Sequence, residues 1–236
     1  MNVNSRPCVP DGLRVYAIGD VHGRADLLEE LYDAIARDAA RARGQAGVIV
    51  HLGDYVDRGA WSRAVLERLL APPPGGMARV CLKGNHEALM LDFLAGRDHS
   101  GLWLANGGID TLRSYGVSGQ GGEGLRRALA ARLPAEHHAF LAGLPLSHRV
   151  GDYHFCHAGV RPGVPLAGQS EADLLWIREE FLDSGADFGA VVVHGHTVTR
   201  DPVERANRIG IDTGAYATGR LTCLVLSGRG RAYLTT

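Results

Sequence analysis

The chain has 236 residues, of which 45% are hydrophobic and 22% are charged, a balance that excludes a wholly disordered protein. Its 25 basic and 26 acidic side chains give a net charge of −1, so composition provides no basic excess for binding nucleic acid or an anionic membrane. Its 32 glycines follow no Gly-X-Y period, which excludes a collagen-like chain.

The first 87 residues alternate between short apolar runs and helical patterns. Apolar runs at 14–18, 47–52 and 79–82 predict three strands. Apolar residues recur at helical spacing over 26–43, and residues 61–71 also predict a helix, which the PPPGG stretch then ends. Strands that alternate with helices in this way predict βαβ units and an α/β fold.

The rest of the chain divides into a helical part and a strand-rich part. Residues 88–149 contain helical stretches and the glycine-rich tract 118–124, so we expect a mostly helical insertion there. Beyond residue 150, residues 170–182 predict a helix. Further apolar runs predict strands at 153–157, 190–194, 208–212, 221–226 and 231–235. We expect residues 1–236 to form one domain that carries the insertion.

Polar residues gather where predicted strands end. Five strands are followed by short glycine-containing segments, which are DVHG (20–23), GDYVDRG (53–59), GNHE (84–87), HAG (157–159) and GHT (195–197). Because loops beyond the carboxyl ends of strands in an open α/β sheet meet at one crevice, we expect these side chains to lie together. Each segment alone would be an ordinary turn or loop. Together, their oxygen and imidazole groups, without a thiolate, predict a site for Mn, Fe, Zn or a similar divalent ion.

These segments closely resemble the motifs of the calcineurin-like metallophosphoesterases. The resemblance is to the PPP-type serine/threonine phosphatase branch, including its bacterial and phage members, and spans residues 19–197. The stretch IDTGAYATGRLTCLVL (211–226) also resembles the bacterial and phage members. The resemblance implies a mixed α/β fold of four layers, with two mixed β-sheets packed face to face and helices outside.

The resemblance implies a site for two divalent metal ions. The first ion would be held by Asp20, His22 and Asp54, and Asp54 would bridge to the second, whose other ligands would be Asn85, His157 and His196. A carboxylate suits the bridging position because its two anionic oxygens can bind two cations about 3.5–4 Å apart. The neutral amide of Asn85 would limit the negative charge and keep the metals electrophilic. Mn²⁺ is the ion expected first, with Fe, Zn, Co and Ni as alternatives.

The resemblance also implies direct attack on phosphorus by a hydroxide that bridges the two metals. Arg58 is expected to clamp phosphate oxygens with its forked donors, and Arg178 resembles a second phosphate-binding arginine. His86 resembles the general acid that protonates the leaving oxygen, and Asp57 would hold that imidazole charged and oriented.

These assignments predict a metal-dependent phosphomonoester hydrolase that dephosphorylates phosphoserine or phosphothreonine in a protein or peptide. The alternative is a dinucleoside polyphosphate (Ap4A-type) hydrolase, an activity that the superfamily also contains on nearly the same metal set. A phosphodiesterase and a non-catalytic binding module are further alternatives. Residues 88–150 and 160–176, where specificity would reside, contain no readable code for the substrate.

The cysteines and the apolar runs bear on cellular context. Cys81, Cys156 and Cys223 lie in apolar strand-like runs, and the first twelve residues lack the apolar core of a secretory signal. We therefore expect reduced cysteines and a cytoplasmic, bacterial-type protein. The longest apolar runs are too short to span a bilayer. We expect a phosphoprotein partner, with no nucleic acid and no membrane, and the oligomeric state is left open.

Overall fold

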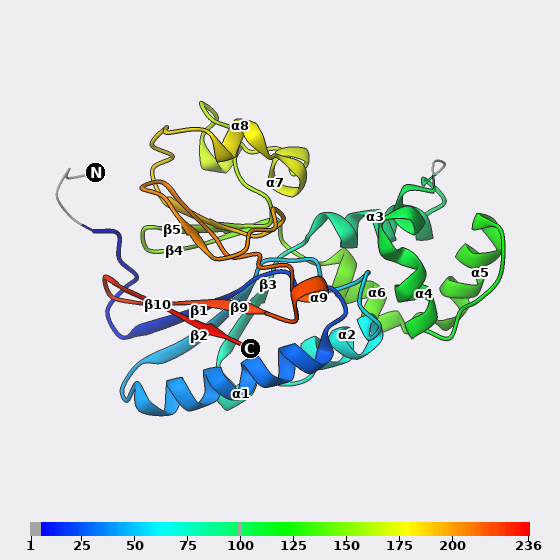
Figure 1. Ribbon diagram of the computed structural model, residues 1–236, viewed down its shortest axis with the longest axis horizontal. Coiled ribbons are helices and arrows are strands. Elements are labelled where there is room, and N and C mark those ends of the chain that lie inside the picture. The colour runs from blue at the N-terminus through cyan, green and yellow to red at the C-terminus, as the bar shows by residue number, and fades with distance from the viewer. Residues whose placement is uncertain (1–5, 99–100) are drawn as a thin grey trace.

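The computed structural model describes residues 6–98 and 101–236, and its centre is a pair of five-stranded sheets (Figure 1). The first sheet has the order β10-β9-β1-β2-β3, in which β1, β2 and β3 are parallel and β9 is antiparallel to both β1 and β10. Its strands are β1 (Leu13–Ile18), β2 (Ala46–His51), β3 (Ala78–Cys81), β9 (Thr222–Ser227) and β10 (Gly230–Thr235).

The second sheet has the order β4-β5-β6-β8-β7, in which β5, β6 and β8 are parallel and each outer strand is antiparallel to its neighbour. Its strands are β4 (Ser147–Val150), β5 (Tyr153–Cys156), β6 (Val191–His194), β7 (Val203–Glu204) and β8 (Arg208–Gly210). Both sheets are therefore mixed, as expected.

The alternation of side chains along the strands explains how the layers form. Val15 and Ala17 of β1 join a buried cluster that also holds Tyr153 and Phe155 of β5, so this core lies between the sheets. Tyr16 and Ile18 of β1 point the other way and join the cluster that contains the helices beside the first sheet. The four-layer α/β fold is confirmed.

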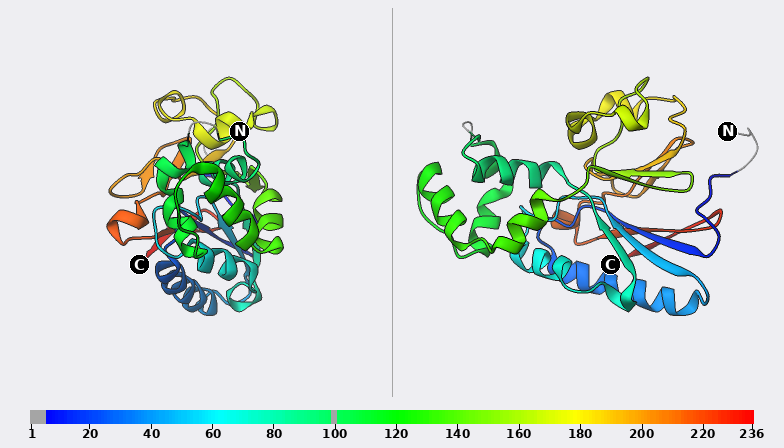
Figure 2. Two further views of the ribbon diagram at one scale, coloured as in Figure 1. Left: turned by 90° about the vertical axis from the view of Figure 1, so that its right-hand side faces the viewer. Right: turned by 180° about the vertical axis from the view of Figure 1, so that it is seen from behind.

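Helices cover the outer faces of both sheets. Helices α1 (Ala25–Arg41) and α2 (Ser62–Leu70) pack on the first sheet, and α7 (Glu171–Trp176) and α8 (Glu179–Leu182) pack on the second. Another group extends from one end of the molecule, as Figures 1 and 2 show. It comprises α3 (Asn85–Leu94), a π-helical segment (Leu104–Gly108), α4 (Ile109–Ser114), α5 (Gly122–Arg132) and α6 (Ala135–Ala142). Within the described residues, no helix is both long and apolar enough to cross a bilayer.

The structure corrects three expectations about the elements. The helix expected over 170–182 is two helices, because the backbone is extended at Ile177, whose side chain is buried beneath the second sheet. The helical region expected over 88–149 begins earlier, at Asn85, and gives way to β4 before residue 149. Strand β7 was not expected, because two residues are too few to show a pattern.

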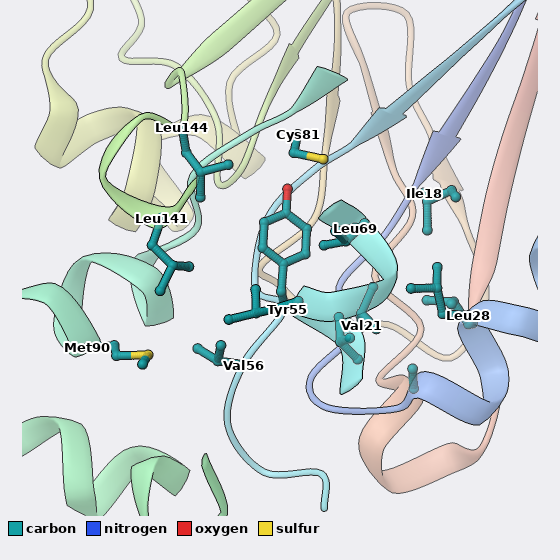
Figure 3. Close-up of a cluster of buried hydrophobic side chains, with 14 of the residues drawn as sticks. Ile18, Val21, Leu28, Tyr55, Val56, Leu69, Cys81, Met90, Leu141 and Leu144 are labelled. Carbon is teal, nitrogen blue, oxygen red and sulfur yellow. The ribbon is translucent and has the colours of Figure 1, made fainter. Parts of the chain in front are cut away.

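The core beneath the loop after β2 holds that loop in place. Tyr55 and Val56, which follow Asp54, are fully buried among residues of α2, α3 and α6 (Figure 3). The Tyr55 hydroxyl donates a hydrogen bond to the Leu82 carbonyl at 2.6 Å, just before the loop that follows β3. The core thus ties the GDYVDRG and GNHE loops to each other.

Candidate metal centre

The five sequence motifs lie at the carboxyl ends of β1, β2, β3, β5 and β6, where the parallel strands of both sheets end. Five of the predicted site residues are also the non-glycine residues with positive φ in the described part of the chain: His22 (44°), Asp54 (53°), Asp57 (73°), Arg58 (68°) and His196 (62°). Such conformations cost about 1–3 kcal/mol each and persist where the surroundings over-determine them. Backbone strain is therefore concentrated at this end of the sheets.

Asp54 lies between two groups of buried histidines. Its Oδ2 atom is 3.4 Å from His22 Nε2 and 3.8 Å from His86 Nε2, and its Oδ1 atom is 3.4 Å from His157 Nε2. Among the described residues, candidate ligand atoms of two sets lie within 4.8 Å of one another, namely His22, Asp54 and His86, and Asp54, His157 and His196. Asp54 belongs to both sets, and a carboxylate that bridges two ions must lie between them in this way.

Backbone carbonyls orient two of the imidazoles. His22 Nδ1 lies 2.9 Å from the Val56 carbonyl oxygen, and His157 Nδ1 lies 3.0 Å from that of Leu52. Because a carbonyl oxygen only accepts, each Nδ1 carries the hydrogen and each Nε2 keeps its lone pair. Both lone pairs face Asp54, so both histidines present the atom that a metal ion would bind.

Asn85, the first residue of α3, joins the second group. Its Oδ1 atom is 2.8 Å from His157 Nε2 and 2.9 Å from His196 Nδ1, and all three side chains are buried. The amide oxygen and the two imidazole nitrogens therefore converge on one small space beside Asp54.

Asp20 lies in neither compact set, but its carboxylate borders them. Its Oδ2 atom accepts the backbone N–H of His196 at 3.0 Å, whereas its buried Oδ1 atom has no hydrogen-bond partner among the described residues. A buried polar atom without a partner costs about 1–3 kcal/mol. A Cβ atom at Gly195 would strike the Asp20 carboxylate, and one at Gly84 would strike that of Asp54. The glycines thus keep the space around both carboxylates open.

The electrostatics of the site favour a cation. Burial raises the pKa of the Asp20 carboxyl, with Asp212 and Asp54 adding to the shift, and burial also raises that of Asp54. Burial lowers the pKa of His157 to about 3, so its imidazole is neutral at pH 7. Crowded carboxylates beside neutral imidazoles form the donor set that divalent transition-metal ions bind. The residues present therefore fit a pair of such ions.

His86 and Asp57 form the expected pair. His86 Nδ1 is 2.7 Å from Asp57 Oδ2, and its Nε2 faces Asp54. Asp57 is fully buried and also accepts hydrogen bonds from Trp103 Nε1 at 3.0 and 3.1 Å and from Thr111 Oγ1 at 2.6 Å. Burial raises the pKa of Asp57, and the hydrogen bonds from Thr111 and Trp103 oppose that rise. Trp103 and Thr111 come from the helical region, and no sequence pattern pointed to them.

The two arginines lie at the mouth of the site. Arg58 Nη1 is 2.8 Å from His22 Nε2, and its guanidinium lies over the ring of Tyr216, 4.8 Å from the centroid. Arg178 is exposed, and its Nη1 donates to Thr197 Oγ1 at 3.3 Å, next to His196. Arg58 must leave the His22 nitrogen before either residue can fill its expected role.

Glu87, the last residue of GNHE, is a site residue for which the sequence motif indicated no role. Its carboxylate accepts the backbone N–H groups of Gly84 at 2.8 Å and Asp54 at 2.9 Å, and those of Tyr55 at 2.7 Å and Val56 at 3.3 Å. Burial raises the pKa of Glu87 to about 8. Glu87 therefore binds the loop after β2 to the loop after β3. Its position in the GNHE motif is the sequence signal that could have indicated a role in the site.

Comparisons with known proteins show what the chain as a whole resembles. The family model of the calcineurin-like phosphoesterases matches residues 13–219. The chain is 32% identical to serine/threonine-protein phosphatase 1 of Salmonella typhimurium, over 88% of this chain and 89% of that protein. It is 28% identical to serine/threonine-protein phosphatase 2 of Escherichia coli, over 88% of this chain and 90% of that one.

A relative of another kind and a solved structure complete the comparison. The chain is 30% identical to the symmetrical bis(5'-nucleosyl)-tetraphosphatase of Aromatoleum aromaticum, over 64% of this chain and 46% of that protein. A crystal structure described as that of a candidate diadenosine tetraphosphatase superposes with a TM-score of 0.65 at 23% identity and covers 98% of both chains. This structural similarity supports the fold.

Proposed function

Because the chain belongs to the calcineurin-like phosphoesterase family, we propose that it hydrolyses phosphomonoesters of serine and threonine in proteins, with the help of two metal ions. The observation that carries the proposal is the position of Asp54 between two histidine groups, with the His86–Asp57 pair beside it. This arrangement provides a place for two cations and a proton donor next to the same carboxylate.

The proposed ligands combine residues of the two sets with Asp20, which borders them, and with Asn85. Asp20, His22 and Asp54 would hold one ion, and Asp54, Asn85, His157 and His196 the other. Bound there, two divalent ions would supply Lewis-acid activation of the phosphate ester and of a water molecule. Manganese is proposed first among the divalent ions that such an oxygen and nitrogen ligand set accepts.

The protein's own groups would orient the substrate and deliver a proton. Arg58 and Arg178 would bind phosphate oxygens at the mouth of the site, where a guanidinium fork matches two oxygens at once. Asp57 holds Nδ1 of His86, so Nε2 is the atom free to donate a proton to the leaving oxygen. Asp57 would also stabilise the charged imidazole in that role.

The substrate class and location complete the proposal. Phosphoserine and phosphothreonine are favoured because two relatives named serine/threonine-protein phosphatases are 32% and 28% identical to this chain, above the 24% of the asymmetrical bis(5'-nucleosyl)-tetraphosphatases that match the same 88% of it. Dinucleoside polyphosphates are the second candidate, which the relative from Aromatoleum aromaticum supports. The bacterial cytoplasm is the proposed location, in line with the free cysteines Cys8, Cys81, Cys156 and Cys223.

The test compares substrates on one preparation. The manganese-loaded protein is assayed with a phosphothreonine peptide, diadenosine tetraphosphate and p-nitrophenyl phosphate, with Asp54→Asn as the inactive control. We expect kcat/KM for the peptide to exceed that for diadenosine tetraphosphate at least tenfold. The opposite order would assign the chain to the second candidate class. Absence of hydrolysis by folded, metal-loaded protein would instead indicate a binding module.

A further inference from the structure

A groove lined by arginines lies far from the candidate metal centre. It encloses about 670 Å³, and its charged lining residues are Arg6, Glu204, Arg205, Arg229 and Arg231. Arg205 precedes β8, and Arg229 lies in the turn between β9 and β10, beside Ser227, which pairs with Arg14 near the start of β1. Both arginines therefore lie near the amino ends of parallel strands, opposite the carboxyl ends at which the five motifs lie. We call this feature the arginine groove.

The arginine groove carries a charge opposite to that of the whole chain. Its four arginines and one glutamate give a local charge of +3, whereas the chain has a net charge of −1. Arg231 Nη1 binds Glu204 at 2.8 Å, and the Tyr233 hydroxyl donates to the other Glu204 oxygen at 2.6 Å. Within residues 6–98 and 101–236, Arg6, Arg205 and Arg229 form no ion pair, so their donors remain free for an anionic ligand.

The neighbouring backbone favours a peptide as that ligand. Strand β10 is an edge of the first sheet and β7 is an edge of the second, and residues of both line the groove. An edge strand presents backbone N–H and C=O groups that an extended peptide can pair with, whereas a nucleic acid has no matching row of groups. Acidic side chains on the same peptide would meet the free guanidinium groups.

We infer that the arginine groove docks an acidic, extended segment of the phosphoprotein substrate, away from the phosphorylated residue; the inference rests on the proposed function. Strand β1 has six residues and therefore separates the two ends of the sheet by about 20 Å. An extended linker between the acidic segment and the phosphorylated residue must span at least that distance, which takes at least about six residues. A substrate bound by its acidic segment at the arginine groove would present its phosphorylated residue to the candidate metal centre at a raised effective concentration.

The first experiment measures binding without catalysis. A fluorescent, unphosphorylated peptide of eight acidic residues is titrated with the protein, and its anisotropy gives Kd. We expect Arg205→Glu with Arg229→Glu to weaken binding at least tenfold. The matched control is Arg113→Glu with Arg127→Glu, which changes the net charge equally at exposed arginines of α4 and α5, in the helical region, and should change Kd less than twofold. Equal weakening by both pairs would show attraction by net charge alone and overturn the inference.

The second experiment tests spacing. Phosphothreonine peptides carry the acidic segment three or ten residues away, and KM is measured for each. We expect the longer spacer to lower KM at least fivefold, and the Arg205→Glu, Arg229→Glu variant to lose that difference while keeping its kcat/KM for p-nitrophenyl phosphate. Hydrolysis of the peptides without any effect of spacer or variant would refute docking but leave the proposed function intact. Tight, arginine-dependent binding of an oligonucleotide with no binding of the peptide would also overturn the inference.

Discussion

Trp103 links the helical region to the chemistry of the site, and the substitution Trp103→Phe isolates that link. The fully buried indole N–H donates to both oxygens of Asp57, at 3.1 and 3.0 Å. Phenylalanine keeps an aromatic ring to pack against Phe93, whose ring centroid lies 4.6 Å away, but it has no donor. Asp57 would retain only Thr111 and His86 as side-chain partners.

The size of the effect follows from the lost hydrogen bond. A hydrogen bond to a charged group contributes about 1.5–3 kcal/mol, so the free energy of unfolding should fall by about that amount. Loss of that hydrogen bond should also raise the pKa of Asp57, because the Trp103 donor favours the charged carboxylate. A less stable carboxylate stabilises the charged imidazole of His86 less. We therefore expect kcat for a phosphothreonine peptide to fall about tenfold, which is less than the ~10²–10⁴ that a whole general acid contributes.

The assay compares two leaving groups. The weakly basic p-nitrophenolate needs little protonation, so kcat on p-nitrophenyl phosphate should fall less than about threefold. That smaller loss would come from any shift in the position of the His86 ring. The control is Trp61→Phe, because Trp61 is 49% exposed, and it should change neither kcat nor the urea midpoint. Equal losses on both substrates would show that Trp103 supports only the fold. The predicted fall in the free energy of unfolding, together with an unchanged kcat on the peptide, would refute the claim that Asp57 controls His86.

Three further perturbations test separate parts of the structure. Asp54→Asn should reduce bound manganese from two ions to one or none in an atomic-emission assay, because an amide presents a single oxygen; retention of both ions would contradict bridging. Tyr216→Ala should raise the inhibition constant of inorganic phosphate about 2- to 5-fold, because a cation–π contact of about 0.5–1 kcal/mol with Arg58 is lost, whereas Tyr216→Phe should not; equal effects would exclude that contact. Burial lowers the pKa of His154 to about 4, so acid protonates the unfolded chain first and stability should decline from about pH 6.5 towards pH 4. His154→Leu should flatten that decline in urea unfolding at pH 7 and pH 5, and an unchanged slope would exclude His154 as its source.

The parts of the fold that could be predicted are those with strong apolar patterns. The run at 14–18 identified β1, because its side chains are buried on both faces of the first sheet. The break in the helix expected over 170–182 could not be predicted, since neither glycine nor proline occurs within it. That break accompanies the burial of Ile177 against the outer face of the second sheet, which is a tertiary contact.

The same division applies to the site. The side chains that converge on Asp54 could be predicted, because short local motifs carry them to strand ends. The partners of Asp57 could not, since Trp103 and Thr111 lie 46 and 54 positions away along the chain. Asp212, which lies beside Asp20, was inside a recognised stretch, but no local rule indicated that contact. Long-range support for a site has no signature in a single sequence.

The strain at the site explains why Glu87 is needed. Five non-glycine residues with positive φ cost about 1–3 kcal/mol each, a sum comparable to the net stability of a typical domain, about 5–15 kcal/mol. Three of them, Asp54, Asp57 and Arg58, belong to the loop after β2, and Glu87 accepts hydrogen bonds from backbone N–H groups of that loop. Asn85 and His86, in the same motif, face the space beside Asp54 instead. One four-residue motif therefore serves two purposes, because Asn85 and His86 line the space beside Asp54 while Glu87 binds the strained loop that carries Asp54.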